Sequence, residues 1–473
     1  MRNFIVGSVL LVAACATNPV TGKSQLSLVS EAQEIEMGRA EVTRARQESG
    51  FIADATLEQY VAGIGKQMAA ASERPALPWE FHVIDDPMVN AFAAPGGFIF
   101  ITRGILTYLN SEAELAAVVG HEIGHVTAKH TVAMLSQQQL AQVGLMAGAI
   151  AAPKVAGGVA GQLAGTAASL YFLKFSRNDE SQADQLGHRY SLKQLYDVRE
   201  MPNTFRTLER LSAVSGGNGM PNFLSTHPDP GSRVQKTQAW ADTVSNPSRL
   251  HSDRDRFLTR IDGLLFGEDP EQGYFENGRF LHPGLKFQFM VPQGWQTSNT
   301  LAQVAMAEPN GTAQVSLSGA QQSTVDAAAQ AFLAQQGLTS PGAQRTTVNG
   351  VPAVTADFTA ATQDGQQLRG SVLFLQHNGQ VFQFLGLALA SSWGQQGGAI
   401  TQVLRSFGPT SASQQFQQRK YLRIVTLPRA TPVATLAQQS NGAVSAQTLA
   451  IINGVPDGAS LPAGKRVKTV VYR

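Results

Sequence analysis

The spacing of apolar residues divides the chain into a helical first half and a second half in which strands predominate. Between Ser27 and about Asp262 the apolar side chains recur at the three- and four-residue intervals of a helix. Examples are Leu115, Val118, Val119, Ile123 and Val126. The first half is therefore predicted to be mainly α.

The pattern changes at about Leu285 and stays changed to Phe407, where short runs of alternating apolar and polar residues predict strands. The tight turns expected between these strands are Asn349-Gly350, Asp364-Gly365 and Asn378-Gly379. One amphipathic stretch, from Val325 to Gln336, predicts a helix among them. This region is therefore predicted to be α+β.

The end of the chain forms a third region. A linker rich in Ser and Gln is expected from Gly408 to Gln418. Beyond it the pattern predicts strand, helix, helix, strand, with the helices around Val433–Gln439 and Ala446–Ile452. We therefore expect a multidomain protein, with a leader over residues 1–14 and domains over 15–265, 271–408 and 419–473.

The first fifteen residues are typical of a bacterial lipoprotein signal. Met1 to Asn3 carry a positive charge, and the apolar run from Phe4 to Ala14 suits a secretory signal but is too short to span a bilayer. The run ends in small residues before Cys15, the only cysteine in the chain, which resembles a lipobox with Cys15 as the acylated residue. Ala16 then favours the outer membrane over inner-membrane retention. The alternative is an ordinary signal with an incidental cysteine.

Composition supports a globular, multidomain protein and gives no support for nucleic-acid binding. Of 473 residues, 43% are hydrophobic and 15% are charged, and the net charge is only +2. A single cysteine excludes an intramolecular disulfide. The Ala- and Gly-rich stretch from Val143 to Leu173 is expected to be buried helix and loop, because Pro153 and Lys154 interrupt it.

The sequence SEAELAAVVGHEIGHVTAKH predicts a metal site on a helix. Ser111 and Glu114 form a capping pattern that predicts the helix start. His121 and His125 are four residues apart, about 40° round the helix and ~6 Å along it, so both imidazoles can reach one ion. Glu122 projects beside that ion, where it can take a proton from a zinc-bound water and pass it to a leaving amine.

A catalytic zinc needs a third protein ligand, and Glu180 is the best candidate. It lies at the start of a second predicted helix, and Asp184 follows one turn later on the same face. Asp184 is expected to accept the outward N–H of a liganding histidine. Asp179 and Glu200 remain alternative third ligands.

A nearby histidine is not expected to bind the metal. The position at which metzincins carry a third histidine is Thr131, and His130 comes one residue earlier. On a continuous helix His130 would point about 140° away from His125. We therefore expect His130 to be a solvated or structural residue.

The order of motifs resembles metallopeptidase family 48, the gluzincin group of HtpX- and BepA-type enzymes. The similar segments are NAFAAPGGFIFITRGIL (90–106), HEIGH, the ExxxD that begins at Glu180, and THPDPGSR (226–233). They lie between Asn18 and about Asp262, and NPVTGKSQLSLVS after Cys15 resembles the lipoprotein branch. The resemblance implies a zincin-type domain with a small edge β-sheet. It also implies one Zn²⁺ per chain, held by the two histidines and Glu180, with Glu122 as general base.

Three further roles follow only from this resemblance. Phe98 to Thr102 would be an edge strand along which an extended substrate lies. His227 would approach the zinc or the oxyanion, and Arg233 would support the site. The alternatives are a His-Pro turn and an Arg at a helix start with surface roles.

The C-terminal regions resemble two other families. LKFQFMVPQGW (285–295) and the elements after it are similar to PsbP-like domains. The last fifty residues resemble a divergent LysM, a glycan-binding unit, except that Arg429-Ala430-Thr431 replaces the usual Gly-Asp-Thr turn. Peptidoglycan is therefore a candidate partner of the tail.

These expectations combine into a zinc metalloendopeptidase of the bacterial envelope. It would be lipid-anchored in the outer membrane, face the periplasm, and hydrolyse misfolded or unassembled envelope proteins as part of protein quality control. The alternative is a periplasmic chaperone or assembly factor with low or self-inhibited proteolysis. A cell-wall-binding scaffold is a third reading that depends on the tail alone.

Overall fold

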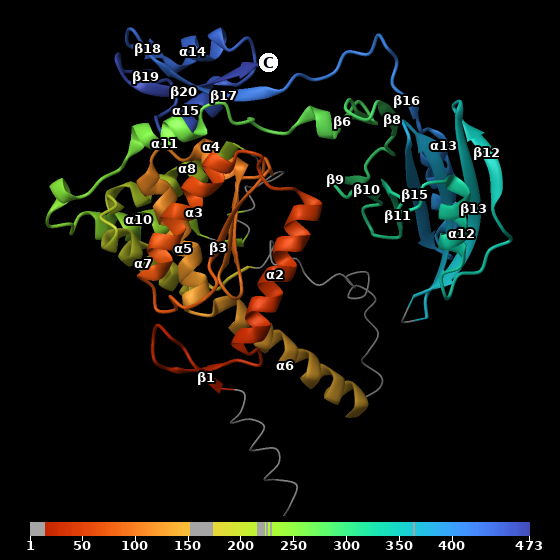
Figure 1. The fold of residues 1–473 in the computed structure, drawn as a ribbon, viewed down its shortest axis with the longest axis horizontal. Coiled ribbons are helices and arrows are strands. Elements are labelled where there is room, and N and C mark those ends of the chain that lie inside the picture. Colours follow the sequence, from red (N-terminus) through yellow and green to blue (C-terminus); the bar gives the residue numbers. More distant parts are fainter. Residues whose placement is uncertain (1–14, 152–173, 215–222, 224–225, 228, 363–364) are drawn as a thin grey trace, which may run out of the picture. The chain divides into compact units, whose positions relative to one another are not determined.

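The computed structural model describes residues 15–151, 174–214, 223, 226–227, 229–362 and 365–473 (Figure 1). The chain folds into two compact units, each a mixture of helices and sheets. The first comprises the described residues up to Arg46, then Gly50–Glu268 and Lys420–Arg473. The second comprises Gln47–Ser49 and Asp269–Arg419. The protein is therefore multidomain and mixed α/β. In the described part of the chain, no helix has both the length and the hydropathy to cross a bilayer.

A small sheet in the first unit has the order β3 (Glu80–Ile84), β5 (Phe98–Thr102), β4 (Ala91–Ala94). β5 pairs in parallel with β3 and antiparallel with β4. Phe98–Thr102 is thus the central strand, and its expected place at the edge is wrong. All five of its residues are buried, and such an apolar strand is satisfied by a partner on both sides.

The core of this unit surrounds helix α5 (Glu112–Thr127), which is buried along its whole length. Helix α3 (Ala55–Ala70), helix α7 (Arg177–Lys193) and strand β4 pack against it. α5 and α7 approach closely through glycines. A Cβ added at Gly187 would lie 2.8 Å from the backbone nitrogen of His121, and one at Gly120 would lie 3.0 Å from the Cα of Gly187. The backbones of the two helices are therefore in direct contact.

The remaining elements of the first unit cover this core. They are α2 (Glu31–Glu48), α4 (Arg103–Tyr108), α6 (His130–Ala151), η3 (Val198–Glu200), α8 (Met201–Val214), α10 (Pro230–Ala241), η4 (Pro247–Arg249) and α11 (Arg254–Ile261). The stretch expected to be buried helix and loop from Val143 onward is helical up to Ala151. Residues 152–173 lie outside the described residues.

A short N-terminal arm lies against the end of α5. Its hairpin pairs β1 (Cys15–Thr17) with β2 (Ser24–Leu26). Between these strands, Asn18 Nδ2 donates to the carbonyl of Ala128, the C-cap residue of α5, at 2.9 Å. The arm therefore caps the helix that carries the HEIGH motif.

The last 54 residues form the expected strand–helix–helix–strand unit, and they belong to the first compact unit. Its elements are β17 (Lys420–Thr426), β18 (Thr431–Pro432), α14 (Val433–Gln439), α15 (Ala446–Ile452), β19 (Ser460–Leu461) and β20 (Arg466–Tyr472). Leu422, Leu449 and Val470 are fully buried in one continuous core with residues of α3 and α5. The tail is therefore packed onto the first half of the chain.

Lys468 on β20 is also fully buried at this junction. Its ammonium donates to the carbonyls of Thr107 and Ile452, both at 2.9 Å, and to the carbonyl of Leu109. Thr107 and Leu109 lie at the C-terminal end of α4, where helix carbonyls lack partners of their own. A cation in the tail thus caps a helix in the first half of the chain.

The second unit contains a seven-stranded antiparallel sheet in the order β12-β13-β14-β15-β11-β10-β9. These strands are β9 (Gln296–Asn299), β10 (Gln303–Ala307), β11 (Ala313–Gly319), β12 (Gln344–Val348), β13 (Val351–Ala361), β14 (Gln367–His377) and β15 (Gln380–Leu389). Helices α12 (Val325–Leu333) and α13 (Trp393–Arg405) pack on the sheet. Asn349-Gly350 and Asn378-Gly379 form the expected turns, with positive φ at all four residues. Asp364 lies outside the described residues.

A smaller sheet completes the second unit. Its order is β16 (Gly408–Pro409), β8 (Phe287–Met290), β7 (Arg279–His282), β6 (Tyr274–Glu276), and the short helix η5 (Pro270–Gln272) precedes it. Gly408 and Pro409 pair with β8, so the linker begins after Pro409 rather than at Gly408.

Candidate metal centre

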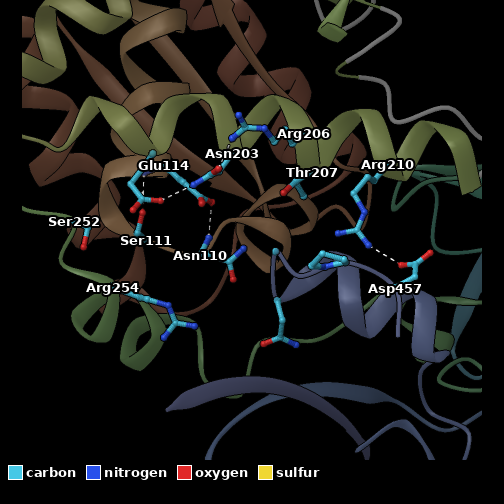
Figure 2. Close-up of a pocket in the computed structure, with 14 residues that line it drawn as sticks. Asn110, Ser111, Glu114, Asn203, Arg206, Thr207, Arg210, Ser252, Arg254 and Asp457 are labelled. Carbon is cyan, nitrogen blue, oxygen red and sulfur yellow. Dashed lines mark hydrogen bonds and ion pairs between the residues drawn. The ribbon is translucent and has the colours of Figure 1, made fainter. Parts of the chain in front are cut away.

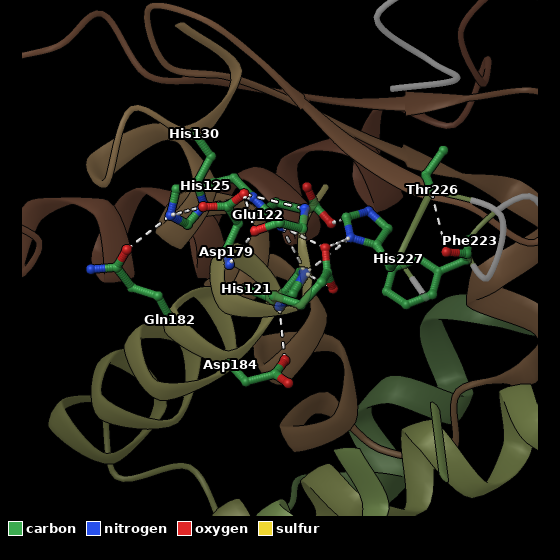
Figure 3. A network of polar contacts seen from close by, with 12 residues as sticks. His121, Glu122, His125, His130, Asp179, Gln182, Asp184, Phe223, Thr226 and His227 are labelled. Carbon is green, nitrogen blue, oxygen red and sulfur yellow. Dashed lines mark hydrogen bonds and ion pairs between the residues drawn. The ribbon is translucent and has the colours of Figure 1, made fainter. Parts of the chain in front are cut away.

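Helix α5 presents two histidines to one point. Its N-terminus is capped as the sequence predicts, with the Ser111 hydroxyl accepting from the Glu114 N–H at 3.1 Å. His121 and His125 are both 1% exposed, and their Nε2 atoms lie 3.0 Å apart (Figure 3). Two ring nitrogens this close, in a dry interior, favour a cation that both can bind.

Helix α7 brings a carboxylate to the same point. A reciprocal capping box between Ser176 and Asp179 starts the helix, and Glu180 follows in its first turn. One Glu180 oxygen lies 3.6 Å from His121 Nε2, and the other lies 3.5 Å from His125 Nε2. The close packing of α5 on α7 therefore sets these distances.

His227 joins this group from the segment before α10. Its Nδ1 lies 2.8 Å from a Glu180 oxygen and 3.2 Å from His121 Nε2. On its other side, Nε2 lies 3.6 Å from an oxygen of Glu122 (Figure 3). His227 therefore lies between the donor group and the glutamate of the HEIGH motif.

The four side chains of His121, His125, Glu180 and His227 fit a zinc ion. Their donor atoms lie within 4.8 Å of one another, and all four residues are buried. Ligands at 2.0–2.1 Å in a tetrahedron are about 3.3 Å apart, and the measured separations between neighbouring donors run from 2.8 to 3.6 Å. Both oxygens of Glu122 are buried without a hydrogen bond among the described residues, so neither oxygen is committed to a donor of the protein.

Burial and neighbouring charges shift the pKa values of these buried side chains in different directions. Burial raises the pKa of Glu122 and lowers the pKa of His125 well below its usual value. Burial would also raise the pKa of Glu180, but the positive charges of His227 and Arg233 outweigh it and lower that pKa. Glu122 is thus biased toward the protonated form and Glu180 toward the carboxylate form that binds a cation.

His121 is oriented from behind by an ion pair. Its Nδ1 lies 2.9 Å from Asp184, one turn beyond Glu180 on α7. Arg233 binds Asp184 with two nitrogens, at 2.7 and 2.9 Å, and its Nη1 lies 3.0 Å from Glu180. Burial opposes the charge on Asp184, but Arg233 and His121 hold its pKa well below the usual range. A carboxylate at Nδ1 leaves Nε2 of His121 as the metal-facing atom.

The two alternative ligands lie away from the donor group. Asp179 is used as the cap of α7, and its nearest ring contact is with His130 at 3.6 Å. Glu200 lies in η3, where it accepts from the Asn203 side chain at 2.9 Å. Among the described residues, Glu180 is therefore the one carboxylate in the donor group.

His130 lies outside the donor group and is a buried, structural residue, as expected, but the expected direction of its side chain is wrong. It is 4% exposed, and its Nδ1 lies 2.9 Å from Nδ1 of His125. The 140° argument fails because α5 ends at Thr127 and Lys129 adopts a left-handed φ of 58°, so that His130 begins a new helix. No pattern in the sequence marks this break, since Lys129 is a good helix former.

A cavity of about 580 Å³ lies elsewhere in the first unit, between the start of α5, helix α8 and the loop after α15 (Figure 2). Arg210 on α8 donates to the carbonyl of Val455 at 2.6 Å and to Asp457 at 2.7 Å. Glu114 also lines the cavity, and its burial raises its pKa to about 8. The loop after α15 is therefore bound by the first half of the chain.

The sequence of this unit matches a known family. Residues 55–241, which contain HEIGH, Glu180, His227 and Arg233, match the sequence model of Peptidase family M48. The chain contains a peptidase family M48 domain. The peptidases of this family depend on zinc, and the donor group of this M48 domain fits that metal.

Two named peptidases are similar to part of the chain. The chain is 30% identical over 271 residues to the Beta-barrel assembly-enhancing protease of Escherichia coli (strain K12), covering 56% of this chain and 53% of that protein. It is 35% identical over 184 residues to the Mitochondrial metalloendopeptidase OMA1 of Schizosaccharomyces pombe, covering 38% of this chain and 52% of that protein. The chain thus spans about half the length of the curated relatives it matches.

A solved structure is similar to part of the chain. The solution structure of cyanobacterial PsbP from Synechocystis sp. PCC 6803 covers 28% of this chain and 91% of its own, at 14% identity and a TM-score of 0.24.

Proposed function

We propose that this protein is a zinc-dependent endopeptidase. The observation that carries the proposal is the four-donor group beside the buried carboxylate of Glu122, which makes no hydrogen bond among the described residues, inside an M48 domain. His121, His125 and Glu180 would hold one Zn²⁺ per chain. Asp184 and Arg233 would orient His121 and keep Glu180 ionised.

Zinc, when bound, polarises a carbonyl and makes a bound water more acidic. Glu122 takes one proton from the attacking water, whose oxygen forms the new bond to the carbonyl carbon. The C–N bond then breaks, and Glu122 gives the proton to the leaving amine. Burial raises the pKa of Glu122, so this carboxylate is a stronger base than a solvated one and is better suited to take the proton from water.

The substrate is proposed to lie extended along β4. This strand is at the edge of its sheet and packs against α5, which carries Glu122. At the start of that edge, the carbonyl of Val89 already accepts a main-chain hydrogen bond from Phe223, at 3.3 Å. Main-chain pairing of this kind binds unfolded segments with little demand on sequence.

We further propose that the substrates are misfolded or unassembled envelope proteins and that the site of action is the periplasmic face of the outer membrane. Support comes from the lipobox-like residues at Cys15 and from the relative named a beta-barrel assembly-enhancing protease. The LysM-like tail keeps peptidoglycan as a proposed partner.

A second candidate function is a chaperone or assembly factor with restrained proteolysis. The specific observation in its favour is His227, whose ring nitrogen lies among the metal donors. A catalytic zinc keeps one coordination position for water, and a fourth protein ligand there would block hydrolysis.

The Glu122→Gln variant tests the proposed reaction. We expect the wild type to hold about one zinc per chain and to degrade unfolded casein, with loss of degradation after chelation. The variant should keep zinc and fold but lose cleavage, because the ligands remain and the base is gone. His121→Ala, the matched ligand variant, should lose the metal as well.

Two results would contradict the proposal. A wild-type protein that holds no zinc after preparation without chelators would contradict the proposed metal site. Cleavage by Glu122→Gln at the wild-type rate would remove Glu122 as the base.

A further inference from the structure

The two histidines of α5 face different partners on their outer sides. Nδ1 of His121 faces the carboxylate of Asp184 at 2.9 Å. Nδ1 of His125 faces another imidazole, with His130 Nδ1 at 2.9 Å. His130 in turn has its Nε2 2.9 Å from Oε1 of Gln182, on α7 (Figure 3). Behind His125, the hydrogen bonds therefore run through His130 to the neutral amide of Gln182, and an oxygen of Asp179 lies 3.6 Å from the same nitrogen of His130.

The proton positions along this chain follow from its chemistry. His125 offers Nε2 to the donor group, so its proton must be on Nδ1. Two ring nitrogens 2.9 Å apart share one proton, so Nδ1 of His130 must accept it. The proton of neutral His130 is then on Nε2, where the Gln182 oxygen accepts it. Each donor in the chain has one acceptor, and this network assigns a single tautomer to each ring.

The surroundings hold the two rings in this arrangement. The Phe175 ring stacks on His125 with centroids 4.0 Å apart and planes 26° apart. The turn before His130 is held by Lys129, whose ammonium lies 2.7 Å from Glu34, and by the bond from Asn18 to Ala128. These contacts offset the strain of the left-handed backbone at Lys129. That backbone conformation directs His130 back toward α5.

We propose that His130 is a positioning residue for the metal centre, which fixes the tautomer and ring orientation of His125, and that Gln182 fixes His130. The inference rests on the proposed zinc site and adds to it. Acceptors behind liganding histidines commonly contribute 10–100-fold to metal affinity. In this protein that acceptor, for one of the two histidines, is a neutral imidazole in place of a carboxylate or backbone carbonyl.

Zinc affinity, measured by competition with a chromophoric chelator, tests the proposal without any activity assay. His130→Phe keeps a ring of similar size but offers no acceptor, so we expect affinity to fall about 10–100-fold. His130→Asn places an amide oxygen near the position of Nδ1, so it should restore most of that loss. Gln182→Leu removes the hydrogen-bond acceptor of His130 Nε2 and leaves the Asp179 oxygen, 3.6 Å away, as the polar group facing that nitrogen. The tautomer is then held less firmly, and the loss of zinc affinity should be intermediate.

The control is His188→Phe, a half-buried histidine on the same helix as Gln182 that packs on Trp240 away from the donor group. It should leave zinc affinity unchanged. The absorption bands of the Co²⁺-substituted protein should shift in His130→Phe and return in His130→Asn, because they report ligand geometry.

The outcomes separate two failures. A wild type that binds no zinc overturns the proposed function. Zinc binding that is equal in wild type and His130→Phe overturns the positioning role and leaves the site in place. Equal losses of zinc affinity in His130→Phe and His130→Asn would show that His130 acts by packing and not as a hydrogen-bond acceptor. Circular dichroism of the metal-free protein shows whether His130→Phe folds. If it does not, the zinc affinities of Gln182→Leu and His188→Phe are compared instead, and equal affinities overturn the positioning role.

Discussion

The Nδ1 of His227 lies 3.2 Å from His121 Nε2, so on the proposed function it would occupy the position that a catalytic zinc keeps for water. We expect His227→Ala to raise basal degradation of an unfolded substrate, including self-cleavage, with zinc content unchanged. The physical reason is that removal of a fourth donor opens the coordination position. Turnover of casein by wild type and variant, at matched zinc content, is the measurement.

A fall in rate of ~10²-fold or more would instead assign His227 to stabilisation of the oxyanion. A rate unchanged within error would contradict both roles and leave His227 as a residue of the turn before α10.

Protonation of Glu114, which lies outside the metal-donor group, makes the free energy of unfolding depend on pH. It is buried, accepts from the Asn110 N–H at 2.7 Å, and has a pKa raised by burial from 4.5 to about 8. The folded protein therefore holds this proton at pH values where the unfolded chain releases it. The stability from this group is full below about pH 4.5 and is lost as the pH rises to about 8.

Glu114→Gln should remove this dependence, because an amide oxygen can still accept from Asn110. Urea unfolding at several pH values should show that the free energy of unfolding of the variant rises relative to that of the wild type between pH 5 and 8. Exposed Glu36→Gln controls for the loss of one negative charge. A difference between Glu114→Gln and wild type that does not change with pH would contradict the prediction.

At the scale of elements, the distance between α5 and α7 determines whether the ligands meet. Gly187 is the closest point, since a Cβ there would lie 2.8 Å from the backbone of His121. Gly187→Ala should push the helices apart, with a stability loss of about 1–3 kcal/mol and weaker zinc binding. Gly63→Ala on α3 is the matched control, because its Cβ would meet nothing within 4 Å.

The control should gain about 0.5–1 kcal/mol, as alanine does over glycine in an exposed helix. Thermal unfolding and chelator competition measure the two effects. Zinc affinity equal in Gly187→Ala and wild type would show that the ligands tolerate a wider helix spacing.

The elements also show which parts of the site the sequence could predict. The spacing of His121 and His125 and the caps at Ser111 and Ser176 are local features, and the two helices start where they indicate. The position of His130 was missed because a left-handed Lys129 breaks the helix without a glycine. The central place of β5 was missed because strand order is set by distant partners, β3 and β4.

At the scale of the whole molecule, the tail and the first half of the chain share one core, and Lys468 is a fully buried polar group at their junction. The strand and helix boundaries of the tail follow its sequence pattern closely. The packing of the tail could not be read from that pattern. A lysine in KRVKTVV would be expected to face solvent, whereas Lys468 is fully buried and donates to three carbonyls. Burial lowers its pKa to about 7.

Lys468→Met should lower the free energy of unfolding by about 3 kcal/mol, because carbonyls of Thr107, Leu109 and Ile452 lose their donor in a dry interior. Exposed Lys465→Met should change it by about 0.5 kcal/mol or less. Peptidase activity should be lost at a lower urea concentration in Lys468→Met than in Lys465→Met. Equal midpoints would show that the tail does not stabilise the M48 domain.

The N-terminal arm has a consequence for how the proposed peptidase would meet its substrates. Cys15 is three residues from Asn18, and three extended residues reach about 10 Å. Asn18 is bonded to Ala128, which is three residues, or about 5 Å along a helix axis, from His125. Acyl chains on Cys15, as proposed, would thus hold the scissile bond within about 20 Å of the lipid. The enzyme would then search a thin layer above one membrane, and clients would reach it by lateral diffusion along that surface.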